Sequence, residues 1–78
     1  MVTKTQQQQQ RLIGAISLGE RNEIRVVIVP YRNKEYVHVR HYFEDSEGQW
    51  LPTKKGVALD TELVGELKAL IDKVAEFD

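Results

Sequence analysis

The sequence predicts an α+β domain in which four β-strands precede one C-terminal helix. Two runs rich in β-branched and aromatic residues, 25–29 and 36–43, have the length of strands, and residues 31–34 between them have the length of a hairpin connection. After residue 60, apolar side chains recur with the spacing of a helix. These three observations give the predicted order, with the strands first and the helix last.

The first two strands are predicted at residues 11–18 and 24–29. Apolar and polar residues alternate near the end of the first run, as in a strand with one buried face. Residues 19–23 are predicted to form a turn or a bulged crossing. The second run is apolar at almost every position, so we expect it to be covered on both faces over part of its length. Pro30 places the end of this strand at a sheet edge or a bulge.

The third strand alternates more clearly, and a short fourth strand follows it. Residues 45–48 have the composition of a turn, and the fourth strand is predicted at Gln49–Leu51, where Pro52 stops it. Along the third strand Val37 and Val39 share one face. The other face, which we expect to be solvated or to bind a ligand, carries Tyr36, His38, Arg40 and Tyr42.

Asp60 is a suitable N-cap for a helix that runs to about Phe77. Its apolar residues follow spacings of four, three, four and three, and one helix cannot bury such a seam by itself. We expect the seam to lie partly on its own sheet and partly on a partner subunit. The alternative is that it packs wholly on its own sheet. The seam consists of Leu63, Leu67, Leu70, Val74 and Phe77, widened by Val64 and Ile71.

The length of 78 residues and the absence of cysteine indicate one small domain that gains stability by association. Such a chain buries only about 60% of its unfolded surface, so we expect a homodimer. The longest apolar run, Val26–Val29, is far below the roughly 20 residues of a membrane helix, and the N-terminus lacks the apolar core of a signal peptide. We therefore expect an intracellular, soluble protein without membrane contact.

Residues 1–10 are predicted to form a disordered Gln-rich tail, and residues 11–78 the folded domain. The tail contains Gln6–Gln10 and too few apolar residues to offset the entropy of ordering. The alternative is that the glutamine run extends a helix or mediates association.

The net charge of −1 is unevenly distributed. Residues 1–57 hold nine Lys/Arg and six Asp/Glu, a net charge of +3, whereas residues 58–78 hold two and six, a net charge of −4. A basic segment followed by an acidic C-terminal helix allows positive electrostatic potential to concentrate on one surface of the molecule.

No constellation of residues indicates catalysis, a metal site or a cofactor. His38 and His41 lie three positions apart in a strand and project to opposite faces, so they cannot bind one metal together. We expect His38 to be a surface ring and His41 to be partly buried and hydrogen-bonded. Neither serine has a nucleophile motif, and the acidic residues of the helix are expected to be solvated.

Cations and aromatic rings form the remaining constellation, which is typical of a surface for an unpaired nucleic-acid strand. Cations follow phosphates, while each ring stacked on a base contributes about 1 to 3 kcal/mol with little dependence on base sequence. The alternative is that Tyr42, Phe43 and Trp50 are core residues and the cations a solubilising fringe. The predicted DNA-binding residues are Arg21, Arg25, Tyr31, Arg32, Lys34, Arg40, Phe43, Trp50, Lys54 and Lys55.

From Ile24 to about Val74 the chain resembles the C-terminal domain of positive cofactor four, a transcriptional coactivator family that binds single-stranded DNA. The resemblance is carried by Val-x-Val-Arg-x-Tyr-aromatic at 37–43, Asp-x-Glu-Gly at 45–48 and Pro-x-Lys-Lys-Gly-Val-x-Leu at 52–59. It implies a curved four-stranded antiparallel sheet, a helix, and a homodimer formed by helices and inner strands. The expected interface residues are Val27, Val29, Leu63, Leu67, Leu70 and Val74.

The resemblance also implies roles for individual residues. The hairpin aromatic and basic residues that grip DNA in the family correspond to Tyr31, Arg32 and Lys34. Arg40 and Phe43 correspond to an arginine and a second ring, although a bulge or the strand's end must turn Phe43 away from the face of Val37 and Val39. Lys54 and Lys55 correspond to the basic pair after the proline.

We therefore expect a non-enzymatic homodimer that binds single-stranded DNA, or the strands of melted duplex, with little sequence preference. Its role would lie in transcription regulation or in DNA replication, recombination or repair, with transcription or replication proteins as further partners. The expected location is the cytoplasm or nucleoid for a bacterial or phage protein and the nucleus for a eukaryotic one. The alternatives are a dimeric interaction module that docks an acidic partner through its basic sheet, an RNA-binding protein, and a small-molecule enzyme.

Overall fold

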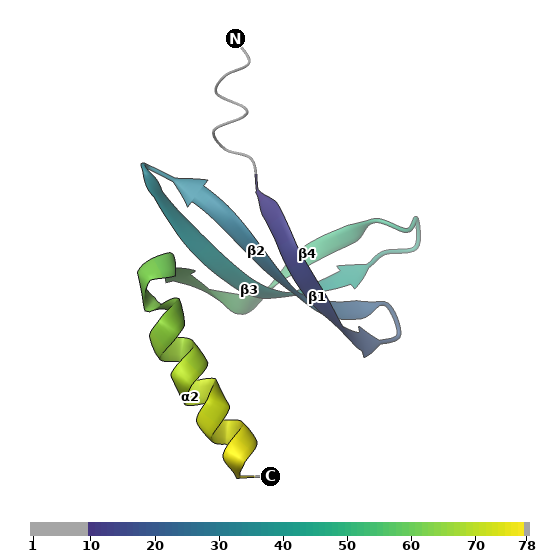
Figure 1. Cartoon of the computed structure of the whole chain (residues 1–78). Helices are drawn as coiled ribbons and strands as arrows, with labels where there is room; N and C mark the ends of the chain where they lie inside the picture. The colour runs from purple at the N-terminus through teal and green to yellow at the C-terminus, as the bar shows by residue number, and fades with distance from the viewer. Residues whose placement is uncertain (1–9, 78) are drawn as a thin grey trace.

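The computed structural model describes residues 10–77, which form one antiparallel sheet followed by a helix (Figure 1). The sheet order is β1-β2-β3-β4, so each strand pairs with its neighbours in sequence, and the predicted fold class is confirmed. The predicted tail, residues 1–10, lies outside the described residues except for Gln10. The elements are β1 (Arg11–Gly19), β2 (Asn22–Tyr31), β3 (Lys34–Glu44), β4 (Trp50–Asp60), the 3-10 helix η1 (Thr61–Leu63) and α2 (Val64–Glu76).

Two tight hairpins join the first three strands. Tyr31 pairs with Lys34, and the two residues between them, Arg32 and Asn33, have φ angles of 52° and 66°. Two consecutive positive φ angles give a type I′ turn, whose twist matches that of the flanking strands. The β1–β2 turn has the same form, with φ of 48° at Glu20 and 66° at Arg21. Both turns lie where the sequence predicts them.

The fourth strand is much longer than predicted, because it continues through Pro52 to Asp60. β4 is an edge strand, where proline is tolerated because one side of the strand has no neighbour to bond. A bulge then places residues 53–55 opposite His41 alone. The Thr53 hydroxyl fixes this bulge by donating to the His41 carbonyl at 3.0 Å and accepting from the Lys55 amide at 3.1 Å. Because Pro52 and the bulge interrupt the alternation of apolar and polar residues, the sequence pattern does not reveal this strand.

The core lies in the two central strands and is small. Val27 of β2 is 5% exposed and Val37 of β3 is 8% exposed. Val27 pairs with His38 and Val37 pairs with Ile28, so the two valines lie on opposite faces of the sheet. The expected covering of residues 24–29 on both faces is therefore complete only at Val27, and the rest of this run is half-buried.

The helix begins as predicted but does not cover its own sheet. Asp60 is the N-cap of η1, with extended backbone and a carboxylate that accepts from the Glu62 amide at 2.9 Å. α2 then extends away from the strands (Figure 1), and its seam stays open, with Leu70 60% and Val74 64% exposed. The alternative that the seam packs wholly on its own sheet is wrong. Within residues 10–77 there is no helix with the length and apolar character needed to cross a membrane.

Candidate nucleic-acid interface

The tip of the β2–β3 hairpin brings together an exposed ring and two cations. The type I′ turn is so short that Tyr31, Arg32 and Lys34 lie within four consecutive residues at the end of the sheet. Tyr31 is 56% exposed, and the guanidinium carbon of Arg32 lies 5.1 Å from the centre of its ring. The structure thus gathers the three hairpin residues that the sequence predicts, with an aromatic ring that solvent reaches.

Lys34 is engaged by a carboxylate from another part of the chain. Tyr36 pairs with Asp60, and this register brings Asp60 beside Lys34, whose Nζ donates to Asp60 Oδ2 at 3.0 Å. The hydrogen bond from Lys34 to Asp60 raises the pKa of the lysine. The pKa of Asp60 is lowered, mainly by the hydrogen bond from the Glu62 amide and further by Lys34. Both groups are held in their charged forms.

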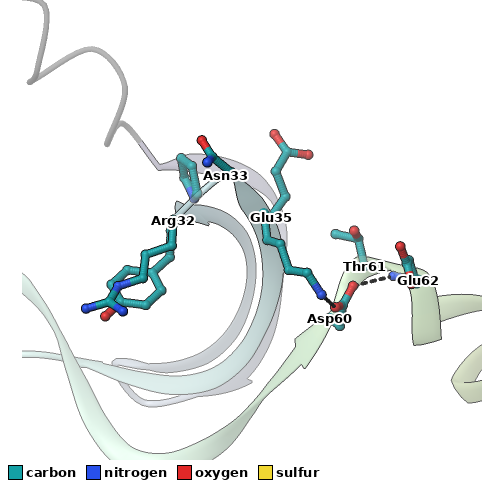
Figure 2. A pocket seen from close by; sticks show the side chains of 9 residues that line it. Arg32, Asn33, Glu35, Asp60, Thr61 and Glu62 are labelled. Carbon is teal, nitrogen blue, oxygen red and sulfur yellow. Dashed lines mark hydrogen bonds and ion pairs between the residues drawn. The ribbon is translucent and has the colours of Figure 1, made fainter.

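An open hollow of about 990 Å³ lies between the hairpin tip and η1. Figure 2 shows Arg32 on one side of it and Asp60 with Glu62 on the other. Glu35 forms a salt bridge with Arg11 of β1, with 3.2 Å between Arg11 Nη2 and Glu35 Oε2. The hollow is thus cationic and aromatic toward Arg32 and acidic toward η1. It is lined by residues 30–35 and 60–62.

Another cation, Arg25, lies against two aromatic rings near the middle of the sheet. Its guanidinium carbon lies 4.7 Å from the centre of the Tyr42 ring and 5.5 Å from that of Trp50. Its Nε lies 2.5 Å from a carboxylate oxygen of Glu23. All of these residues are half-buried. Arg25 and Trp50 thus stabilise the sheet through a cation–π contact. For Trp50 this agrees with the alternative that the ring has a structural role.

The remaining cations of this region surround the β4 bulge. Arg40 donates from Nη1 to the Thr53 carbonyl at 2.9 Å, so part of its donor capacity holds the backbone. Lys54 and Lys55, which the bulge carries, are exposed. Among residues 10–77, the cations without a carboxylate partner are Arg21, Arg32, Arg40, Lys54, Lys55 and Lys73.

Phe43 and Arg21 lie away from the hairpin tip. The pairing of β2 with β3 runs without a shift from Tyr31 to Phe43, so Phe43 projects to the face of Val37 and opposite to Arg40. The bulge lies in β4 and does not turn Phe43. Arg21 lies in the β1–β2 turn, where its carbonyl accepts from the Glu44 amide at 2.9 Å. The predicted residues therefore form four groups, at the tip, around Arg25, at the β4 bulge, and at the opposite end of the hairpin.

His41 behaves as expected, whereas His38, expected to be a surface ring, is half-buried. His41 is half-buried, and its Nε2 lies 2.8 Å from the Asn22 side-chain oxygen, while its Nδ1 lies 3.3 Å from the Thr53 hydroxyl. His38 projects to the opposite face. In the part of the chain that the structure describes, no three His, Cys, Asp or Glu side chains are grouped to hold a metal ion.

The carboxylates that engage the predicted cations are the residues that sequence reasoning missed. Glu23 lies two positions before Arg25 in a strand, and this spacing places both side chains on one face and would have indicated the pair. The contact of Asp60 with Lys34 depends on the β3–β4 register. A fourth strand predicted to end at Leu51 could not reveal it.

Comparison with known proteins gives a family match and several structures of similar fold. The family described as Transcriptional Coactivator p15 (PC4) matches residues 18–70. The orthorhombic crystal structure of a PC4 homologue from Burkholderia pseudomallei K96243 has a TM-score of 0.79 at 25% identity, covering 83% of this chain and 88% of that one. The tetragonal form gives 0.79 at 24% identity, covering 86% and 98%.

A phage protein shares the fold at lower similarity. The bacteriophage T5 homologue of the eukaryotic coactivator PC4, described as implicated in recombination-dependent DNA replication, has a TM-score of 0.64 at 22% identity, covering 81% of this chain and 76% of that one. No curated protein matches the sequence.

Proposed function

Because the chain belongs to the Transcriptional Coactivator p15 (PC4) family, we propose that it is a homodimer that binds single-stranded DNA with little sequence preference. Its role is binding rather than catalysis, in transcription regulation or in DNA replication, recombination or repair. The strands of locally melted duplex are a suitable ligand, because two copies would offer two hairpin tips.

The observation that carries this proposal is the exposed Tyr31 ring at the hairpin tip, with the Arg32 guanidinium over it. The ring is 56% exposed, and the guanidinium group lies 5.1 Å from its centre. A nucleobase stacks on a flat ring only when the base is unpaired and its face is open. Because Arg32 lies over one face of the Tyr31 ring, a base would stack on the other face or displace the guanidinium, which would then meet the adjoining phosphate. Duplex DNA hides its base faces, so this arrangement favours a single strand.

The tip does not act alone, because other cations offer phosphate contacts. Lys54 and Lys55 are exposed, and neither has a carboxylate partner among the described residues. Arg25, Arg40 and Trp50 contribute chiefly by holding the sheet in shape. Phe43, 37% exposed, lies on the opposite face of the sheet, and Arg21 lies in the β1–β2 turn. We assign to these two residues only secondary contacts, at the end of the hairpin remote from the tip.

Homodimerisation is supported by the open seam of α2. Four of its residues, Leu63, Leu70, Val74 and Phe77, are exposed, and a single chain provides no cover for them. Burial of one such side chain contributes about 1.5 to 3 kcal/mol, so a second copy gains much by covering them. We assign the interface to Leu63, Leu67, Leu70 and Val74 with Val29. Val27, the remaining predicted interface residue, is already 5% exposed within the single chain, so it has little surface left for a partner to cover.

Fluorescence anisotropy with labelled oligonucleotides tests the proposal. We expect the Tyr31→Ala variant to lose about 1 to 3 kcal/mol of binding to single-stranded DNA, because a stacking ring is removed. The matched Tyr31→Phe variant keeps the ring and should bind nearly as well as the parent protein. Equal affinity for duplex and single strand, or an unchanged affinity of Tyr31→Ala, would refute the proposal.

The same measurement distinguishes the rival function. A module that docks an acidic protein would bind its partner with strong salt dependence, yet would be insensitive to removal of Tyr31. An RNA-binding protein would use the same stacking and phosphate contacts. Comparing the affinities for matched DNA and RNA oligonucleotides distinguishes it from a DNA-binding protein.

A further inference from the structure

Lys34, a predicted DNA-contacting cation at the hairpin tip, is already neutralised in the free protein. Its Nζ donates to Asp60 Oδ2 at 3.0 Å. The side chain of Lys34 is 56% exposed, so its long stem is free to swing toward solvent, whereas that of Asp60 is 23% exposed. A phosphate that binds Lys34 must therefore compete with this carboxylate.

Asp60 is fixed in place, so it cannot follow the lysine. Its second oxygen, Oδ1, accepts from the Glu62 amide at 2.9 Å as the cap of η1. Glu62 lines the same side of the hollow and adds negative charge there. A phosphate on this side would meet two carboxylates, while a phosphate near Arg32 would not.

We propose, on the premise that the hairpin tip binds single-stranded DNA, that Asp60 is an affinity-limiting residue that holds Lys34 away from the phosphates. Binding at Lys34 replaces one ion pair by another, so its net electrostatic gain is small. The carboxylate thereby restrains affinity and directs the phosphate backbone toward the Arg32 side of the tip. No DNA contact is assigned to Asp60 itself.

The Asp60→Asn variant separates the charge of Asp60 from its capping role. Asparagine is as good an N-cap as aspartate, so the variant keeps the bond to the Glu62 amide and loses the attraction to Lys34. Asp60→Ser provides a second uncharged cap if asparagine disturbs the fold. Asp72→Asn is the matched control, because it removes one negative charge from an exposed pair with Lys68 on α2, at 3.2 Å. Circular dichroism confirms that each variant is folded.

We expect Asp60→Asn to bind a labelled oligothymidine about two- to fivefold more tightly than the parent protein at low salt, the scale of one exposed ion pair. The gain should shrink as salt is added. In a Lys34→Gln background the same substitution should give a much smaller gain, because the restrained lysine is absent and only the direct repulsion between Asp60 and phosphate is removed. Asp72→Asn should leave affinity nearly unchanged.

Two results would overturn the role of Asp60 while leaving the proposed function intact. One is unchanged affinity of Asp60→Asn and Asp60→Ser in a parent that binds the oligonucleotide. The other is an equal gain with and without Lys34, which would indicate general repulsion of phosphate. Failure of the parent protein to bind any single strand would instead refute the proposed function and this inference together.

Discussion

Gly56 lies directly opposite Arg40 across the β3–β4 pair, and the two backbones are too close for a side chain at Gly56. An ideal Cβ there would lie 2.7 Å from the Val39 carbonyl oxygen and 2.8 Å from Arg40 Cα. Both neighbours are backbone atoms of a central strand, so they cannot move aside without disturbing the sheet. The close approach follows immediately after the bulge of residues 53–55.

We therefore predict that Gly56→Ala destabilises the fold by about 1 to 3 kcal/mol, the usual cost of overpacking. Gly65→Ala is the matched control, because a Cβ at this helical position meets nothing within 4 Å. Alanine there should stabilise the protein by about 0.5 to 1 kcal/mol through helix propensity. Urea unfolding measures both effects, and equal effects at the two glycines would contradict the geometry.

The cluster of Arg25, Tyr42 and Trp50 predicts a spectroscopic change. Trp50 is the only tryptophan of the chain, so its fluorescence reports on this cluster alone. Arg25→Met should shift the emission of Trp50 and lower stability by about 1 kcal/mol, because the cation–π contacts are lost and Glu23 is left without its partner. Arg21→Met is the control, because Arg21 lies in an exposed turn. It should leave the emission of Trp50 unchanged and should change the free energy of unfolding by no more than about 0.5 kcal/mol. An unaltered spectrum in Arg25→Met would show that the guanidinium does not contact the indole.

The open seam of α2 predicts which substitution separates the subunits. Leu70 is 60% exposed in the single chain, and burial of a leucine contributes about 1.5 to 3 kcal/mol per copy. Leu70→Glu should therefore weaken the proposed dimer at least about a hundredfold. Ala69→Glu adds the same charge at a position outside the seam and should leave the dimer intact. Sedimentation equilibrium distinguishes the two, and a dimeric Leu70→Glu would exclude the seam as the interface.

The ion pair at the tip predicts how stability depends on pH. The pKa of Asp60 is lowered in the folded state, so its contribution to stability is present above the ordinary pKa of aspartate and is lost as pH falls through the folded value. The pKa of Lys34 is raised, so its contribution is present below the ordinary pKa of lysine and is lost as pH rises through the folded value. Tyr36 and Glu62 are the other titratable groups that act on Lys34.

Urea unfolding from pH 7 to pH 2 checks this dependence. The parent protein should be more stable than Asp60→Asn near pH 7, and the difference should vanish as the carboxylate is protonated. Asp72→Asn corrects for the loss of one negative charge. A difference that stays constant over this range would show that the charge of Asp60 does not contribute to stability.

The sequence predicts those features that depend on local chemistry. Asn33 tolerates a positive φ, so the hairpin at residues 31–34 is recognisable, and Asp60 identifies the helix start through its capping side chain. The fourth strand was not recognisable beyond Pro52, because the bulge places three residues opposite His41 and breaks the alternation. The pairing of Lys34 with Asp60 follows only from the register of that missed strand.

Two further features depend on more than local pattern. The regular alternation of β3 already places Phe43 on the face of Val37, and the structure contains no bulge in β3 to change this. The seam of α2 is exposed in the single chain, so its contacts with the sheet do not explain the direction in which the helix points. The candidate site was therefore predictable at the hairpin tip, where the residues are adjacent, and less so where distant strands supply the partners.

The order β1-β2-β3-β4 also determines how the chain reaches its fold. Each pairing joins strands adjacent in sequence, so every loop that closes is short and costs little entropy. Sheet assembly is therefore a unimolecular event whose rate does not depend on protein concentration. In the proposed dimer the helix seam would be covered in a later, bimolecular step, so a dilution series of refolding rates would separate the two events.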